Sequence, residues 1–247
     1  MPRTHKTLPR LFIDTAMSAG AEIALDKDQT NYLVNVLRRG AGDQCMVFNG
    51  RDGAFLAEIA QASKKTVTLT LVEQSAAQTP PADLWYGFAP IKRLDYIVQK
   101  ATEMGAGTIQ PVITRYVQNP KLNHDKLAAN AIEAAEQCEV LSVPRIAPAI
   151  AFARLIETWS EVHGDRVLVF CDEESASSSP VDTLAGLEGR RIGLIIGPEG
   201  GFAPEERDML RAQSYVTPIS LGPRILRADT AAVAAMAVIQ ATIGDWR

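Results

Sequence analysis

A glycine-rich segment that directly follows an apolar run is the sharpest chemical feature of the sequence. Residues 193–206 read GLIIGPEGGFAPEE, so a short apolar strand is expected to end at Gly197, Gly200 and Gly201. Glycine lets the backbone approach a ligand closely, and ligands of α/β proteins bind at the carboxyl ends of strands. The segment therefore predicts a ligand-binding loop followed by a helix that begins at Pro204, with a simple tight turn as the alternative.

The residues around this loop limit the ligand chemistry. The lysine and the serine or threonine of a nucleotide P-loop are absent, and the glycines do not follow the dinucleotide-binding spacing. Glu205 and Glu206 stand in the first turn of the predicted helix, where they would repel a phosphate. A ligand with a purine, a ribose or a cationic centre fits this loop better than a polyphosphate.

A second segment with chemical potential follows closely. Residues 219–232 read ISLGPRILRADTAA, in which Arg224 and Arg227 flank an apolar pair after a Gly-Pro turn. A guanidinium offers a rigid fork of donors to an anionic or keto-rich group. The alternative is that both arginines only bridge nearby carboxylates, such as Asp229 or Glu199. The alanine-rich helix that follows is expected to pack closely against another backbone, within its domain or across a subunit interface.

The elements expected to position both segments form an alternating series. Apolar strands are predicted at 84–89, 109–117, 166–171, 191–196 and 215–221, and helices at 91–104, 123–141, 204–212 and 229–243. Strands without polar alternation are typical of a buried, mostly parallel sheet covered by helices.

The first part of the chain has a different pattern. It predicts an apolar run at 10–14, a short helix at 30–38 capped by Asp28 or Thr30, a hairpin of 45–49 with 54–60, and a strand at 66–72. Short strands with tight turns indicate a small barrel. The small, polar and proline-rich residues 74–81 are typical of a linker.

Composition and charge narrow the class of protein. The chain has 247 residues, a net charge of −4 and 47% hydrophobic residues, which is ordinary for a globular protein. Residues 1–72 carry nine Lys/Arg and seven Asp/Glu, whereas residues 131–247 carry ten and seventeen. Only a local grip on phosphates is therefore expected, from basic residues of the first part.

Other sequence features bear on location and metals. No apolar run is long enough for a membrane span, and no apolar segment follows the charged start as a secretory signal would require. Three widely spaced cysteines indicate reduced thiols in the cytoplasm, and no Cys/His pair has the spacing of a metal site.

Taken together, the two chemical segments resemble the RsmE family of 16S ribosomal RNA uridine-N3 methyltransferases. The resemblance extends to PIKRLDYIVQKATEMGAGTIQPVITRYVQ at 90–118, AIEAAEQC at 131–138, and the earlier PRLFID and NYLVNVLRRGAGD. It covers nearly the whole chain. It implies a PUA-like β-barrel RNA-binding domain over 1–73 and a SPOUT methyltransferase domain over 82–247, an α/β fold with a mostly parallel sheet and a trefoil knot.

The resemblance also implies partners and site residues. It implies S-adenosylmethionine as methyl donor without a metal, 16S rRNA or the 30S subunit as substrate, a homodimer, and no membrane association. The donor would be bound by Phe170, Cys171, Ile196, Gly197, Pro198, Gly200, Gly201, Leu221, Gly222, Ile225, Leu226 and Arg227. RNA would be bound by Arg3, Arg10, Arg38, Arg39, Lys92 and Arg93.

Catalytic roles follow from the chemistry of uridine N3, which carries a proton and becomes nucleophilic only when that proton leaves. We expect Arg227 to stabilise the uracil oxygens, with Glu199 or Asp229 as a base or an orienting group. Two departures from the family pattern matter. Asp229 stands where the family has a glutamate between two threonines, and Glu139-Val140 stand near a usual arginine.

Three other readings stay open at this stage. The chain could be a SPOUT enzyme that modifies another RNA or another atom, such as a ribose hydroxyl of transfer RNA. It could be an RNA-binding assembly factor whose donor pocket has decayed. A small-molecule α/β enzyme is the third alternative, which the basic first part mildly disfavours.

Overall fold

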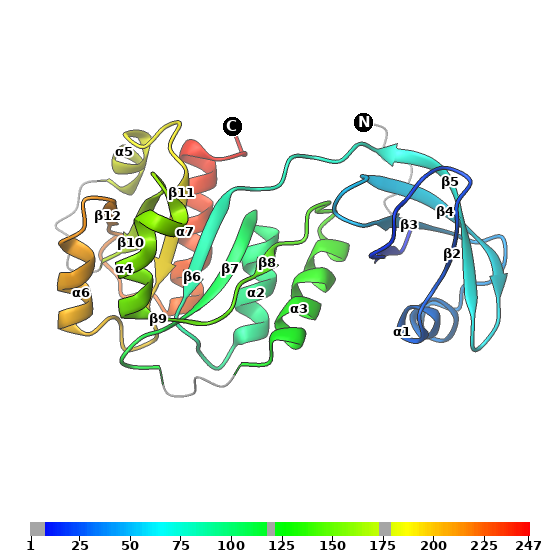
Figure 1. Ribbon diagram of the computed structural model, residues 1–247, viewed down its shortest axis with the longest axis horizontal. Helices are drawn as coiled ribbons and strands as arrows, with labels where there is room; N and C mark the ends of the chain where they lie inside the picture. The colour runs from blue at the N-terminus through cyan, green and yellow to red at the C-terminus, as the bar shows by residue number, and fades with distance from the viewer. Residues whose placement is uncertain (1–7, 118–121, 173–178) are drawn as a thin grey trace. The chain divides into compact units, whose positions relative to one another are not determined.

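The computed structural model describes residues 8–117, 122–172 and 179–247. Its contacts define two compact units, one of Met1–Pro81 with Ala135–Val143 and the other of Ala82–Ala134 with Pro144–Arg247. Each unit has its own sheet and its own core (Figure 1). Arg3 lies outside the described residues.

The first unit is built on a curled five-stranded sheet (Figure 1). Its strands stand in the order β1-β3-β4-β5-β2, and the pair β1–β3 is parallel whereas the other pairs are antiparallel. The strands are β1 (Arg10–Phe12), β2 (Glu22–Ala24), β3 (Gln44–Phe48), β4 (Ala54–Ala62) and β5 (Val67–Ala76). The predicted hairpin is confirmed, because β3 pairs with β4 through a turn in which Asn49 accepts the N–H groups of Arg51 and Asp52.

Two local predictions in this unit are wrong in detail. Helix α1 (Lys27–Asn31) is capped by Asp26, and not by Asp28 or Thr30, because Asp26 accepts the N–H of Gln29 while the Gln29 side chain accepts that of Asp26. It passes into the π-helical turn η1 (Tyr32–Val36). The predicted linker begins inside β5, which pairs with β4 as far as Ala76.

The second unit contains the predicted parallel sheet. Its strands stand in the order β12-β10-β11-β6-β7-β8, with the short β9 also paired to β7, and every pair is parallel. They are β6 (Leu84–Phe88), β7 (Ala106–Ile113), β8 (Arg145–Ile146), β9 (Ile150–Ala151), β10 (Val167–Cys171), β11 (Ile192–Ile196) and β12 (Val216–Ile219). The predicted buried, mostly parallel sheet is confirmed.

Helices cover both faces of this sheet (Figure 1). They are α2 (Leu94–Glu103), α3 (His124–Gln137), α4 (Phe152–His163), α5 (Pro180–Ala185), α6 (Pro204–Arg211) and α7 (Ala228–Ile243). One core joins Trp159 of α4 and Leu210 of α6 to Phe170 and Ile195 of the sheet. Among the described residues, no helix is long and apolar enough to cross a membrane.

The alanine-rich helix α7 packs inside its own unit. It contacts α5, α2 and β11, and its small side chains Ala232 and Ala235 are buried. The close packing predicted from its composition is therefore satisfied within the unit. Its first helical residue is Ala228, with Arg227 at the cap position, so the predicted helix start at Asp229 is late by one residue.

Candidate functional site

The described residues of the second unit enclose a cavity of about 270 Å³ at the carboxyl ends of β10, β11 and β12. Three loops and the first turn of α7 form its wall. The lining residues are Phe170, Cys171, Asp172, Ile196, Gly197, Pro198, Glu199, Gly200, Gly201, Phe202, Arg207, Leu221, Gly222, Arg224, Ile225, Leu226, Ala228 and Ala231. All of the residues that we expected to bind the donor are in this set except Arg227.

The loop after β11 needs its glycines for two different reasons. A β-carbon at Gly197 would lie 3.1 Å from the ring of Phe202, which is itself packed against Phe152 and Phe170. Gly201 has φ of 70° and donates its N–H to the carbonyl of Pro198 over 2.8 Å. The loop is thus closed onto the core by Phe202, and its backbone forms part of the cavity wall.

The two glutamates at the start of α6 are held by partners outside the cavity lining. Glu206 accepts the N–H of Ala203 over 3.0 Å and that of Arg115 over 2.8 Å. Glu205 forms an ion pair with Arg115 over 3.4 Å. Neither glutamate lines the cavity, so neither is placed to repel a phosphate or to face a cationic ligand there. Glu206 instead accepts the N–H of the cap residue Ala203, which is the half of a capping box that remains possible when the cap is alanine.

The loop after β12 contributes both apolar and basic groups. Gly222 has φ of 101°, a conformation that favours glycine, and Arg224, Ile225 and Leu226 line the cavity. The side chain of Ile225 is 86% exposed although it is large and apolar. Arg227 is also exposed, but it lies between lining residues without lining the cavity itself.

Asp229, one of the two predicted carboxylates, is committed to other partners. It is buried, it accepts the N–H of Thr230 over 2.9 Å, and it accepts Nη1 of Arg93 over 3.0 Å. The guanidinium of Arg93 also lies over the ring of Tyr96, 4.5 Å from its centroid. The structure therefore brings a predicted catalytic residue together with a predicted RNA-binding one, beside the cavity-lining Ala228.

Two lining residues, Phe202 and Arg207, were not expected from the sequence, whereas Asp172 and Arg224 fall in the loops after β10 and β12 that the resemblance implies for donor binding. Asp172 follows β10 directly, and this position at the carboxyl end of a strand is the sequence feature that indicates a residue near the ligand. Its buried carboxylate accepts Nε of Arg211 over 3.0 Å. Arg211 belongs to α6, and no local pattern in the sequence links that helix to the end of β10.

The thiol of Cys171 is held neutral at the cavity. Burial raises the pKa of Cys171 to about 12, and the charge of Asp172 acts in the same direction. The uncharged thiol is a small, weakly polar wall group and not an anionic nucleophile at neutral pH.

In the first unit, the basic residues expected to bind RNA differ in exposure. Arg38 is exposed and has φ of 55° just beyond the π-helical turn, and Arg39 is partly exposed.

Arg10 differs from these two arginines, because its guanidinium lies over the ring of Phe48, 5.2 Å from the ring centroid. Its Nε and Nη2 are buried and have no hydrogen-bond partner among the described residues. Burial lowers the pKa of Arg10, although Glu139 and Glu136 oppose this effect. This placement favours a structural role for Arg10.

In the second unit, Lys92 and Arg93 are both exposed just before α2. Glu139 and Val140, which stand where the family pattern has an arginine nearby, belong to the first unit. Glu139 has φ of 58° beyond the end of α3, and Val140 packs against the core that contains Phe48.

Comparisons with known proteins agree with this fold. An RNA methyltransferase domain family matches residues 77–240, and an RNA methyltransferase PUA domain family matches residues 25–72. The class of the protein is therefore an RNA methyltransferase with a PUA domain.

Relatives identify the family within that class. The ribosomal RNA small subunit methyltransferase E of Rickettsia conorii is 33% identical over 234 residues, which cover 94% of each chain. The corresponding protein of Bacillus subtilis is 29% identical and covers 86% of this chain and 87% of its own. The chain belongs to the ribosomal RNA small subunit methyltransferase E family, RsmE.

Solved structures share the fold over nearly the whole chain. A putative methyltransferase of Legionella pneumophila, in complex with the bound cofactor SAM, is 26% identical with a TM-score of 0.82, covering 95% of this chain and 97% of its own. The ribosomal RNA small subunit methyltransferase E of Neisseria gonorrhoeae has a TM-score of 0.82 at 23% identity, and the match covers 97% of this chain and 100% of its own.

Proposed function

We propose that this protein transfers a methyl group from S-adenosylmethionine to N3 of a uridine in the 16S ribosomal RNA of the small subunit. The observation that carries the proposal is the cavity formed by the three strand-end loops, which is lined by all of the expected donor-binding residues except Arg227. The SAM-bound Legionella relative, similar over 95% of this chain, supports the same ligand. When bound, the donor supplies an electrophilic methyl group on a sulfonium centre.

The cavity wall fits the chemistry of such a donor. Ile196, Leu221 and Leu226 offer apolar surface for a purine, and the glycine-rich backbone after β11 offers peptide groups to polar edges. Glu199 adds a carboxylate that favours a cationic centre, whereas a polyphosphate would be repelled. No metal is required by this assignment.

Of the two candidate carboxylates, Glu199 is the better group to accept the N3 proton or to orient the uracil. It is exposed and lines the cavity, whereas Asp229 is buried and bonded to Arg93 and Thr230. Asp229 therefore serves as a positioning residue for Arg93. Arg227, exposed at the start of α7, is assigned to stabilising the negative charge that develops on the uracil oxygens.

The RNA must present an unpaired or extruded uridine, because N3 is a pairing atom inside a duplex. We assign the phosphate contacts to Arg38 and Arg39 in the first unit and to Lys92 and Arg93 in the second. A homodimer, a trefoil knot in the second unit and a cytoplasmic location complete the proposal. The resemblance to the family supports the dimer and the knot, and the three reduced cysteines support the location.

The test is transfer of labelled methyl from S-adenosylmethionine to unmethylated 30S subunits and to naked 16S rRNA in parallel. We expect one of the two RNAs to be labelled, and Glu199→Gln and Arg227→Ala each to lower kcat by about 10²-fold or more. Lys126→Ala, which removes an exposed charge on α3, is the matched control and should behave as wild type. Label on another nucleoside, or on neither RNA, would favour an enzyme that modifies another atom or another RNA.

A donor titration separates the remaining alternative. Calorimetry with S-adenosylmethionine should show saturable binding to wild type. An absence of heat would favour an RNA-binding factor without a functional donor pocket, and the proposed activity would then be withdrawn.

A further inference from the structure

One exposed aromatic side chain lies beside the cavity and takes no part in donor binding or proton transfer as proposed above. Tyr116 follows β7 in the chain and is 46% exposed. A β-carbon at Gly200 would lie 3.6 Å from Cδ2 and 3.8 Å from Cβ of Tyr116, so the tyrosine lies alongside this glycine. Gly200 lines the cavity, and the tyrosine therefore stands at its rim.

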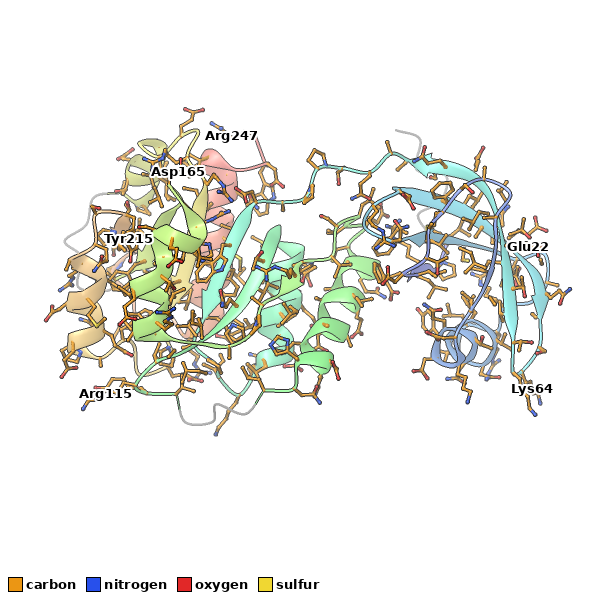
Figure 2. The ribbon with its side chains drawn as sticks, viewed as in Figure 1. Glu22, Lys64, Arg115, Asp165, Tyr215 and Arg247 are labelled. Carbon is orange, nitrogen blue, oxygen red and sulfur yellow. The ribbon has the colours of Figure 1, made fainter. Side chains whose placement is uncertain are left out.

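The backbone that carries Tyr116 is fixed to the helix that follows the cavity loop. The preceding residue, Arg115, donates its N–H to Glu206 over 2.8 Å, and its guanidinium pairs with Glu205 over 3.4 Å. Figure 2 labels Arg115 at the end of the unit where α6 begins. Val117 donates its N–H to the carbonyl of Thr114 over 3.2 Å, which closes a turn around the tyrosine.

Packing within the unit does not account for this ring. Among the described residues, the exposed large hydrophobic side chains of the second unit include two at the cavity, Tyr116 beside it and Ile225 in its lining. Buried aromatic rings nearby, such as Phe202, pack into the core instead. A ring that is anchored through its neighbours and still exposed is suited to contact a flat, apolar ligand surface.

We propose that Tyr116 is the surface on which the target nucleobase stacks once it has left the RNA helix. This inference rests on the proposed function. A base taken out of its stack loses its neighbours, and an aromatic side chain replaces part of that interaction. Tyr116 is thus a residue for positioning and affinity of the RNA substrate, distinct from the groups that bind the donor or handle the proton.

The experiment compares Tyr116→Phe, Tyr116→Leu and Tyr116→Ala in methyl transfer to the RNA that wild type prefers. We expect Tyr116→Ala to raise KM for RNA roughly 5- to 100-fold, with Tyr116→Leu close to alanine and Tyr116→Phe close to wild type. The Kd for S-adenosylmethionine, measured by calorimetry, should stay within about twofold in all three. Trp246→Ala, which removes another exposed aromatic of the same unit, is the control and should leave KM unchanged.

An unchanged KM in Tyr116→Ala would overturn the inference while leaving the methyltransferase assignment intact. A leucine variant equal to phenylalanine would also overturn it, because apolar contact alone would then suffice. If wild type transfers no methyl group, the proposed function fails separately. Ultraviolet crosslinking of bound uridine-containing RNA, with the modified peptide identified by mass, then tests the inference. A crosslink at Tyr116 supports it, and crosslinks found solely at other residues refute it.

Discussion

The guanidinium of Arg93 lies 3.0 Å from the carboxylate of Asp229, although 136 residues separate the two in the chain. The pair joins the residue before α2 to the first turn of α7, immediately after the cavity-lining Ala228. The carboxylate is buried, with its side chain 12% exposed, whereas that of Arg93 is 61% exposed. Removing Arg93 should therefore lower the free energy of unfolding by a different amount from removing the charge of Asp229.

This inequality gives a prediction about stability. Arg93→Ala leaves a buried carboxylate without its cation and should lower the free energy of unfolding by about 1–3 kcal/mol. Asp229→Asn leaves an exposed arginine and keeps an acceptor for Thr230, so it should cost about 1 kcal/mol or less. In the double variant the cost of Arg93→Ala should shrink, which urea unfolding measures as a coupling energy. Additive single effects would contradict the pairing.

The same arginine should affect RNA binding independently of stability. Arg93→Ala should weaken binding to RNA and lower the slope of log affinity against log salt by about 1 at temperatures where the variant is fully folded. Lys126→Ala is again the control. An unchanged salt slope would remove Arg93 from the proposed RNA surface.

A second prediction concerns the loop after β11. Gly197→Ala places a methyl group 3.1 Å from the ring of Phe202, which is held between Phe152 and Phe170 and cannot yield freely. We expect at least about a tenfold loss of affinity for S-adenosylmethionine in calorimetry, because the loop backbone must shift. Gly40→Ala is the control, since nothing lies within 4 Å of its β-carbon. Wild-type donor affinity in Gly197→Ala would show that the loop is not a rigid wall.

A third prediction concerns acid sensitivity. Burial, together with the charges of Arg166, Arg191 and Arg145, lowers the pKa of His163 to about 4. The unfolded state, with a pKa near 6.5, then binds more protons between these two values, so the stability supplied by neutral His163 is present above about pH 6.5. It is lost as the pH falls from there to about 4 and changes no further below that.

His163→Phe tests this dependence, because it keeps a ring 4.2 Å from that of Trp159 but cannot titrate. Relative to this variant, wild type should lose about 1–2 kcal/mol of unfolding free energy between pH 6.5 and 4, after allowance for partial exposure. Parallel pH profiles of the two proteins would be inconsistent with a partly buried histidine that stays neutral.

A fourth prediction concerns thiol reactivity. Burial raises the pKa of Cys45 to about 12, against the opposing charge of Arg39, and Cys171 has a pKa of about 12 as well. Cys138 is exposed. Alkylation at pH 8 should therefore show one fast phase, which disappears in Cys138→Ser. A fast phase that persists in that variant would show that Cys45 or Cys171 is reactive.

The sequence was most informative where a feature is local. Apolar runs with turn residues predicted the β3–β4 hairpin and the parallel strands, because strand alternation and turn chemistry act over a few residues. The loops after β11 and β12 could be recognised as binding segments from their own residue types, whereas the full set of donor residues, including Phe170 and Cys171, was implied by the resemblance to the RsmE family. Helix α4 was missed although Phe152, Leu155, Ile156 and Trp159 follow helical spacing.

Features that depend on contacts between residues far apart in the chain could not be predicted from local sequence patterns. The partnership of Arg93 with Asp229, the contact of Tyr116 with Gly200 and the bond of Arg211 to Asp172 each join separate elements. Tertiary packing decides such contacts, and it also places Glu205 against the side chain of Arg115 and Glu206 against backbone N–H groups. Residue type alone could not distinguish Glu199, which lines the cavity, from these two neighbours.

The most direct test of the central claim is the identity of the methylated nucleoside. After transfer of labelled methyl from S-adenosylmethionine to unmethylated 30S subunits and, in parallel, to naked 16S rRNA, the RNA is digested to nucleosides and analysed by mass. We expect 3-methyluridine as the labelled product, with the label strongly reduced by Glu199→Gln. A methyl group on any other atom or nucleoside, with no 3-methyluridine formed, would contradict it.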